Sequence, residues 1–284
     1  MTSDTSEHTV VYQPDQNRGW APSIWLAMAC DLIASRELVW RLFVRDFSAR
    51  YKQSLLGVFW AVLLPVCAVG TFMVLNSSGI LEVGSTEAPY PAWALLNLTV
   101  WQVFAAGLTA TTGSIVAGGS MVVKINFPKT ALVIASLGNI MVETAIRVLM
   151  IAAVFTWYGV SPKVTAFLAP LVLIPVLALT LGLGLILSLM NALLRDVIHV
   201  VTIGVTFLLF VTPVLYAEPT HGLLSRLNTL NPMAAFVRAA RDLVLNGSLS
   251  NPDIFGWFTV ASIAILLVAW RLFTLVEPRM VERV

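Results

Sequence analysis

The sequence predicts an all-α integral membrane protein with six transmembrane helices, an N-terminal amphipathic interface helix and a re-entrant helical pair before the last span. Hydrophobic residues make up 58% of the 284 residues, charged residues make up 11%, and the mean hydropathy is +0.86. Soluble domains are about one-quarter charged, so this composition excludes an ordinary soluble protein. The apolar stretches are long and continuous, whereas a transmembrane β-barrel shows alternating segments of about ten residues.

Six apolar segments account for the predicted spans. About 20 helical residues cross the ~30 Å hydrocarbon core of a bilayer, and segments near this length lie at about residues 55–75, 92–116, 130–158, 164–190, 197–213 and 254–273. Pro65 lies inside the first segment and predicts a kink there. Residues from about 215 to 252 show a helix–break–helix pattern whose halves are too short to span. This pattern favours a re-entrant pair and a plain loop on the far side about equally.

The distribution of Lys and Arg sets the expected orientation. If the N-terminus is cytoplasmic, twelve of the 17 basic residues lie on the cytoplasmic side, four lie on the opposite side, and Arg147 lies within a span. Because basic residues favour the cytoplasmic side, we expect a multi-pass protein of the inner (plasma) membrane with both termini cytoplasmic. Residues 1–31 form a polar arm without the apolar core of a signal peptide, and residues 32–284 form one transmembrane domain.

An amphipathic helix is expected at residues 32–53, directly before the first span. One of its faces is aromatic, and the opposite face is mainly basic. The aromatic face carries Trp40, Phe43, Phe47 and Tyr51, and the other face carries Glu37, Arg41, Arg45, Ser48 and Lys52. This arrangement suits a helix that lies flat in a membrane interface, with its cations near lipid phosphates or a partner protein. A helix packed on a soluble core is the alternative, which the adjacent span disfavours.

The chain lacks the sequence patterns of an enzyme. His8, His199 and His221 have no Cys or carboxylate neighbours at metal-ligand spacing, so no metal site is predicted. No Gly-x-x-x-x-Gly-Lys-Ser/Thr phosphate loop occurs, so we expect no ATP site and no cofactor in this chain. Glu143 and Arg147 lie four residues apart within a span and are expected to form a structural pair on one helix face. No nucleic-acid partner is predicted.

Aromatic residues on the apolar helices allow two interpretations, since aromatic faces stack on sugar rings and also form ordinary membrane belts. Lipid contact is the better interpretation for Trp93. Phe207 and Phe210 stay open between core and conduit.

Five sequence blocks follow one another between about residues 35 and 247. The first runs from Arg45 to Trp60, with Pro65 after it, and the others are Lys124-Ile125-Asn126-Phe127-Pro128-Lys129, Leu194-Arg195-Asp196-Val197, Thr212-Pro213-Val214-Leu215-Tyr216 and Leu230-Asn231-Pro232-Met233. Together they resemble the ABC-2 type permeases that export polysaccharides such as O-antigen, teichoic acid and capsule. Thr212-Pro213 departs mildly from the Ser-Pro that is usual in that family.

The resemblance implies a transport subunit that works with separate proteins. Two permease chains would form a homodimer and associate with two copies of an ABC ATPase, which would bind ATP and Mg. The residues implied in coupling to that ATPase are Arg41, Arg45, Lys52, Lys124, Asn126, Phe127, Pro128 and Lys129.

The resemblance also implies the substrate and its route. The substrate would be a lipid-linked, O-antigen-like polysaccharide that crosses between the two copies, largely along the first and fifth spans and in contact with membrane lipids. The residues expected along this pathway are Trp60, Trp101, Phe104, Phe207, Phe210 and Tyr216.

Polysaccharide export has three alternatives. An ABC-2 exporter of small lipids or drugs would share the fold and is the main alternative. A membrane acyl- or glycosyltransferase would need acids or histidines clustered near the interface, whereas the acids here are scattered, at Glu82, Glu87, Glu218, Asp242 and Asp253. A secondary carrier is disfavoured because intramembrane charge is sparse.

Overall fold

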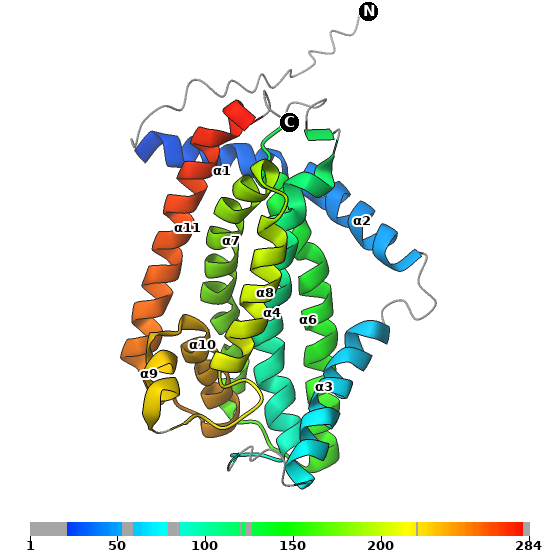
Figure 1. Ribbon diagram of the computed structural model, residues 1–284, viewed down its shortest axis with the longest axis vertical. Helices are drawn as coiled ribbons and strands as arrows, with labels where there is room; N and C mark the ends of the chain where they lie inside the picture. The colour runs from blue at the N-terminus through cyan, green and yellow to red at the C-terminus, as the bar shows by residue number, and fades with distance from the viewer. Residues whose placement is uncertain are drawn as a thin grey trace, which may run out of the picture.

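The computed structural model describes residues 22–52, 59–78, 84, 86–119, 121–122, 127–219 and 221–280, and within these ranges its regular elements are helices (Figure 1). The α-helices are α1 (Pro22–Ala34), α2 (Arg36–Lys52), α3 (Trp60–Ser77), α4 (Tyr90–Gly118), α6 (Thr130–Tyr158), α7 (Ala169–Leu193), α8 (Val197–Val211), α9 (Gly222–Leu230), α10 (Pro232–Arg241) and α11 (Pro252–Met280). A 3-10 helix, η3 (Val164–Leu168), precedes α7, and a π-helical turn, η4 (Asp242–Asn246), follows α10.

The described chain contains four helices that are long and apolar enough to cross a membrane. These are Tyr90–Gly118, Thr130–Tyr158, Val164–Leu193 and Pro252–Glu277, and they lie at the positions of the spans predicted near 92–116, 130–158, 164–190 and 254–273. Trp60–Leu75 and Val197–Val211 are shorter apolar helices in the positions of the first and fifth predicted spans. The start of the predicted first span, at residue 55, lies outside the described residues.

Helix α4 forms the centre of the bundle and is buried along most of its length. It packs against α6 and α7, and α11 packs on α7 (Figure 1). Small residues allow α4 and α7 to approach closely. A Cβ on Gly107 would lie 2.8 Å from Thr180 Cγ2, and a Cβ on Gly184 would meet the Thr111 side chain. Small residues four positions apart are typical of tightly packed membrane helices.

Asn191 closes the turn between α7 and α8. Its Nδ2 donates to the carbonyl oxygen of Thr112 on α4 (3.2 Å), and its Oδ1 accepts from the backbone N–H of Ile198 on α8 (3.1 Å). One buried amide therefore fixes the start of α8 relative to α4 and α7. The third sequence block, residues 194–197, lies at this turn.

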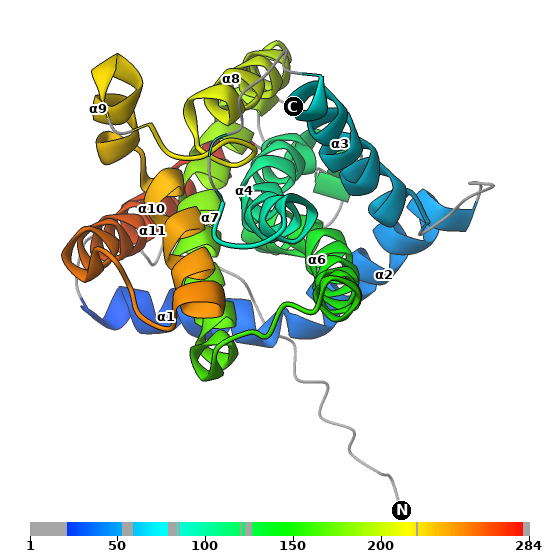
Figure 2. The same cartoon turned by 90° about the horizontal axis from the view of Figure 1, so that it is seen from below.

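The bundle has two ends that differ in structure (Figure 1). At one end, called the α2 end, α1 and α2 lie across the start of α6 and the last turns of α11. At the other, the α10 end, α10 packs against α4, α7 and α11, and α9 stands beside it (Figure 2). Part of the predicted polar arm is helical, since α1 begins at Pro22 and Trp25 packs edge-on against Trp270 of α11 (ring centroids 6.5 Å apart). Residues 1–21 lie outside the described ranges.

Candidate coupling surface and transport face

Helix α2 has a packed and an exposed face, although it begins at Arg36 rather than at residue 32. Phe43 and Phe47 of the predicted aromatic face are half-buried, whereas Trp40 is 63% exposed. Leu42 is buried in a cluster at the α2 end that also contains Val122, Phe127 and Phe273. Phe43 lies directly on Gly138 of α6, because any side chain added at Gly138 would clash with its ring. The apolar face of α2 is therefore partly occupied by the protein itself.

The basic face of α2 points away from this packing. Arg41 is exposed and pairs with Glu37 one turn earlier (2.6 Å), and Arg45 is exposed and pairs with its neighbour Asp46 (2.8 Å). Lys52 is also exposed. Exposed ion pairs of this kind contribute about 0–1 kcal/mol, so Arg41 and Arg45 can exchange these partners for groups on another protein at small cost.

The 124–129 loop is the second predicted coupling element. Two of its residues are buried, which corrects part of the prediction. Phe127 is buried, and Lys129 is only 5% exposed with Nζ lying 4.1 Å from the centre of the Phe127 ring. The backbone N–H of Lys129 donates to Glu277 Oε1 of α11 (2.7 Å). Burial lowers the pKa of Lys129, and the charge of Glu277 opposes that shift. Phe127 and Lys129 therefore hold the loop in place and do not offer a surface to a partner.

Of the three other loop residues predicted to couple, the structure describes Pro128. Pro128 is half-buried, and Lys124 and Asn126 lie outside the described residues. The two predicted coupling elements nevertheless meet in space, since Leu42 and Phe127 share one apolar cluster and Arg45 Nη1 lies 3.9 Å from Met121 Sδ. A force on α2 would therefore reach this loop directly.

The ion pair predicted between Glu143 and Arg147 is confirmed, with Arg147 Nη2 3.0 Å from Glu143 Oε2. The structure adds a third residue that the sequence analysis missed. Arg50, near the end of α2, places Nη1 3.0 Å from the other carboxylate oxygen of Glu143. No spacing rule connects residues 93 positions apart, so sequence gave no signal for this contact.

Helices α3 and α8 lie on the same side of α4 (Figures 1 and 2). Both pack on α4 but leave large apolar side chains uncovered. Phe207 is 70% exposed and Phe210 is 64% exposed, and Trp60 is also exposed on α3. The Tyr216 hydroxyl donates to the carbonyl oxygen of Phe210 (2.8 Å), which fixes the chain just after α8. Four of the six predicted pathway residues therefore lie on or beside this face, which we call the transport face.

Trp101 and Phe104, the other two predicted pathway residues, require a correction. They are 2% and 3% exposed, and their ring centroids are 5.8 Å apart inside the core around α4. A conduit between two copies is lined by surface side chains, which these are not in this conformation. Their role here is packing.

The α10 end brings two of the sequence blocks together. Asn231 accepts from the backbone N–H of Met233 (2.9 Å), capping α10, and donates to Thr212 Oγ1 (2.8 Å). The following carbonyl groups are held by α4, because Asn97 Nδ2 donates to Val214 (3.2 Å) and the Tyr90 hydroxyl donates to Leu215 (2.9 Å). The blocks at 212–216 and 230–233 are therefore parts of one joint.

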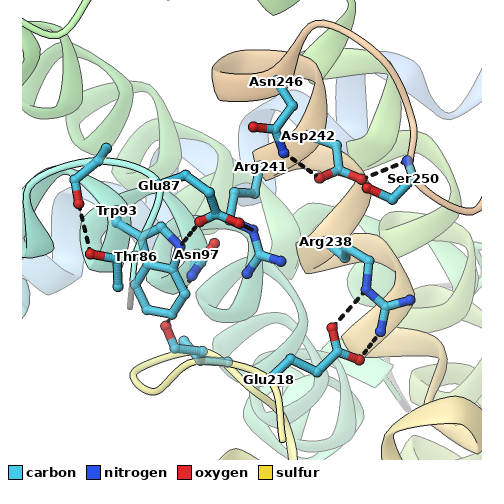
Figure 3. Close-up of polar contacts among 12 residues, drawn as sticks. Thr86, Glu87, Trp93, Asn97, Glu218, Arg238, Arg241, Asp242, Asn246 and Ser250 are labelled. Atoms are coloured by element: carbon cyan, nitrogen blue, oxygen red, sulfur yellow. Dashed lines mark hydrogen bonds and ion pairs between the residues drawn. The ribbon is translucent and has the colours of Figure 1, made fainter. Parts of the chain in front are cut away.

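Two Arg–Glu pairs tie α10 to neighbouring connections (Figure 3). Arg238 binds Glu218, which lies between α8 and α9, through two hydrogen bonds. Arg241 lies over the Trp93 ring (5.5 Å) and 3.6 Å from Glu87, which also accepts from Trp93 Nε1 (2.8 Å). These two acids are scattered in the sequence, and the prediction that Trp93 contacts lipid is wrong, because Trp93 is buried.

Asp242 forms separate hydrogen bonds just after α10. In the π-helical turn it accepts from the backbone N–H of Ser250 (2.8 Å) and from Asn246 Nδ2 (3.0 Å) (Figure 3). Within the described ranges, no group of three or more His, Cys, Asp or Glu side chains is placed to hold a metal ion.

The fold and these two surfaces define a multi-pass helical membrane protein with an amphipathic helix at one end. Residues 37–245 match the ABC-2 type transporter family, and the chain belongs to that family. It is 28% identical over 244 residues to the O-antigen export system permease protein RfbA of Klebsiella pneumoniae, which covers 84% of this chain and 91% of that protein. A protein of the same name from Myxococcus xanthus is 26% identical over 259 residues, 89% of this chain and 96% of that protein.

Proposed function

We propose that this chain is the permease subunit of an ATP-driven exporter that moves a lipid-linked polysaccharide across the cytoplasmic membrane. Its relatives named as O-antigen export permeases support the substrate class. The observation that carries the coupling part of the proposal is the position of α2. Its exposed cations, Arg41, Arg45 and Lys52, lie outside its packed face, which contacts α6 and shares an apolar cluster with Phe127.

The proposal gives each end of the bundle a side of the membrane. The α2 end would be cytoplasmic and would bind an ABC ATPase that carries ATP and Mg, with two such subunits serving two permease chains. Helices α3 and α8 would complete a set of six spans, and α9 and α10 would form a re-entrant pair near the exit. The packing of α10 between other helices supports this, since non-spanning segments are tolerated in a membrane when buried in protein.

The transport face would line a conduit between two copies of the chain. A polyhydroxylated polymer cannot cross lipid unaided, because an unpaired hydroxyl costs about 2–7 kcal/mol in an apolar medium. Exposed aromatic rings such as Phe207 and Phe210 can contact sugar rings without holding them tightly.

The test is a charge reversal on α2, Arg41→Glu with Arg45→Glu and Lys52→Glu. The triple variant should reach the membrane at the normal level, lose copurification of the ATPase, and lose surface polysaccharide in a strain without the native chain. Lys163→Glu with Arg226→Glu is the matched control, because both side chains are exposed and lie at or near the α10 end. Normal export by the triple variant would remove the basic face of α2 from the mechanism.

A further inference from the structure

Near its C-terminal end, α2 reaches a charged cluster on α6. Glu143 lies between two guanidinium groups, with Arg147 on its own helix and Arg50 on α2, each 3.0 Å from one of its two oxygen atoms. Glu143 and Arg147 are buried, whereas the Arg50 side chain is 52% exposed. This cluster therefore joins an exposed end of α2 to a charge within the bundle.

The two arginines hold Glu143 in different ways. Arg147 lies one turn further along the same helix, so it moves with Glu143 and neutralises its charge in any position of α2. A buried carboxylate without a partner is strongly unfavourable, and Arg147 prevents that state. Arg50 can therefore leave Glu143 and enter water without exposing an unpaired buried acid. The contact that Arg50 makes between α2 and α6 is ionic and can be released.

A second contact on the same face of α2 sets the geometry. Phe43 lies seven residues before Arg50, so both side chains point to the same side of the helix. The Phe43 ring rests on Gly138, where the missing side chain allows close approach. Phe43 and Arg50 are thus two of the contacts between α2 and α6, and loss of the Arg50 contact leaves the C-terminal end of α2 held less firmly against α6.

We propose that Arg50 is a positioning residue for transport, acting as a releasable ionic tether through which movement of α2 reaches α6. This inference rests on the proposed function, in which a partner protein moves α2. With the tether formed, a displacement of α2 is transmitted to Glu143. Without it, α2 moves and α6 does not follow.

The geometric part can be tested on the purified chain. Spin labels at Ser48→Cys on α2 and Val148→Cys on α6 report the distance between the helices by electron–electron double resonance, since both positions are exposed. The native Cys30 and Cys67, which are free and exposed, are first replaced by Ser. A narrow distribution is expected with Arg50 and with Arg50→Lys, and a broad one with Arg50→Glu and Arg50→Gln. An equally narrow distribution in Arg50→Glu and Arg50→Gln would overturn the tether.

The functional part uses surface polysaccharide in cells that lack the native chain. Arg50→Glu and Arg50→Gln should reduce export per membrane-inserted permease by about tenfold, within the range usual for coupling between sites. Arg50→Lys should retain most export, and the ATPase should still copurify with all three variants. Arg226→Glu, with the same charge change on exposed α9, should export normally.

The outcomes separate the two proposals. If cells with the unaltered chain carry no more surface polysaccharide than cells without it, the proposed function fails whatever the variants do. If the unaltered chain exports and Arg50→Glu exports equally well, the tether fails while the proposed function stands. If export falls only in proportion to the amount of inserted protein, Arg50 is structural and the inference is wrong.

Discussion

Gly182 offers the sharpest test of the packing that holds the bundle together. It lies on α7 where α11 crosses most closely. A Cβ at this position would lie 2.9 Å from Ile265 Cγ2, 2.9 Å from the backbone N of Leu266 and 3.0 Å from its Cα. Side-chain ends can rotate away from such a contact, but backbone atoms cannot. The change Gly182→Ala must therefore push α11 away from α7.

The expected magnitude follows from two opposing effects. Overpacking by one methyl group in a close-packed core costs about 1–3 kcal/mol. Replacing Gly by Ala in the interior of a helix contributes about 1 kcal/mol in the opposite direction. Gly256→Ala is the matched control, because Gly256 lies in α11 with no atom within 4 Å of the added methyl group. The difference between the two variants isolates the overpacking, about 1–3 kcal/mol.

The assay is unfolding of the purified protein in mixed micelles by increasing mole fraction of sodium dodecyl sulfate, followed by circular dichroism. Gly182→Ala should unfold at a lower fraction than Gly256→Ala, which should match or exceed the unaltered protein. Equal midpoints for the two variants would show that α7 and α11 are not in close contact here, and the packing argument would be refuted.

Three further predictions concern the two ends and the core. Trp101→Ala should lower the free energy of unfolding by about 3–5 kcal/mol, whereas Phe207→Ala should leave it within about 0.5 kcal/mol and reduce export; a stable Trp101→Ala protein would contradict the assignment of that ring to the core. Asn231→Ala should cost about 1–2 kcal/mol through loss of the cap on α10, measured by the same unfolding assay. Burial holds the pKa of Lys129 below that of an exposed lysine. Between these two pKa values the unfolded chain binds more protons than the folded chain, so stability should rise with pH there. This rise should be absent in Lys129→Met, and an unchanged slope would assign it to another group.

Helix boundaries were predictable where a Pro or Gly residue flanks the span. The expected span at residues 130–158 is α6 itself. Pro128 precedes it, and Gly159 ends it in a left-handed conformation (φ 66°) that glycine adopts without strain. The amphipathic character of α2 could likewise be seen, because an interface helix keeps a charged face. The local pair of Glu143 and Arg147 followed from helical spacing alone.

Burial within the spans could not be predicted in the same way. In an apolar medium both the lipid-facing and the protein-facing sides of a helix are hydrophobic, so the periodicity that marks the core of a soluble protein is lost. Trp101 and Phe207 are both aromatic residues on apolar helices, so the sequence does not distinguish them. Trp101 is nevertheless buried, whereas Phe207 is 70% exposed. The burial of Lys129 could not be predicted either. Its backbone N–H donates to Glu277, 148 positions away, and no local pattern predicts that contact.

Interactions between the sequence blocks could also be seen only in three dimensions. The blocks that contain Thr212 and Asn231 were recognised separately, and the structure shows that their side chains are hydrogen-bonded to each other. The same holds for the links from α10 to Glu87 and Glu218, which belong to connections rather than to helices.

The most direct test of the central claim is transport in inverted membrane vesicles that contain this chain and the proposed ATPase partner. Labelled lipid-linked polysaccharide is supplied on the outside together with ATP and Mg, and protection of its sugar portion from an added glycosidase is measured over time. Protection should accumulate with ATP, and should be absent without this chain or with a non-hydrolysable ATP analogue. Equal protection in vesicles that lack the chain would contradict its role as the permease.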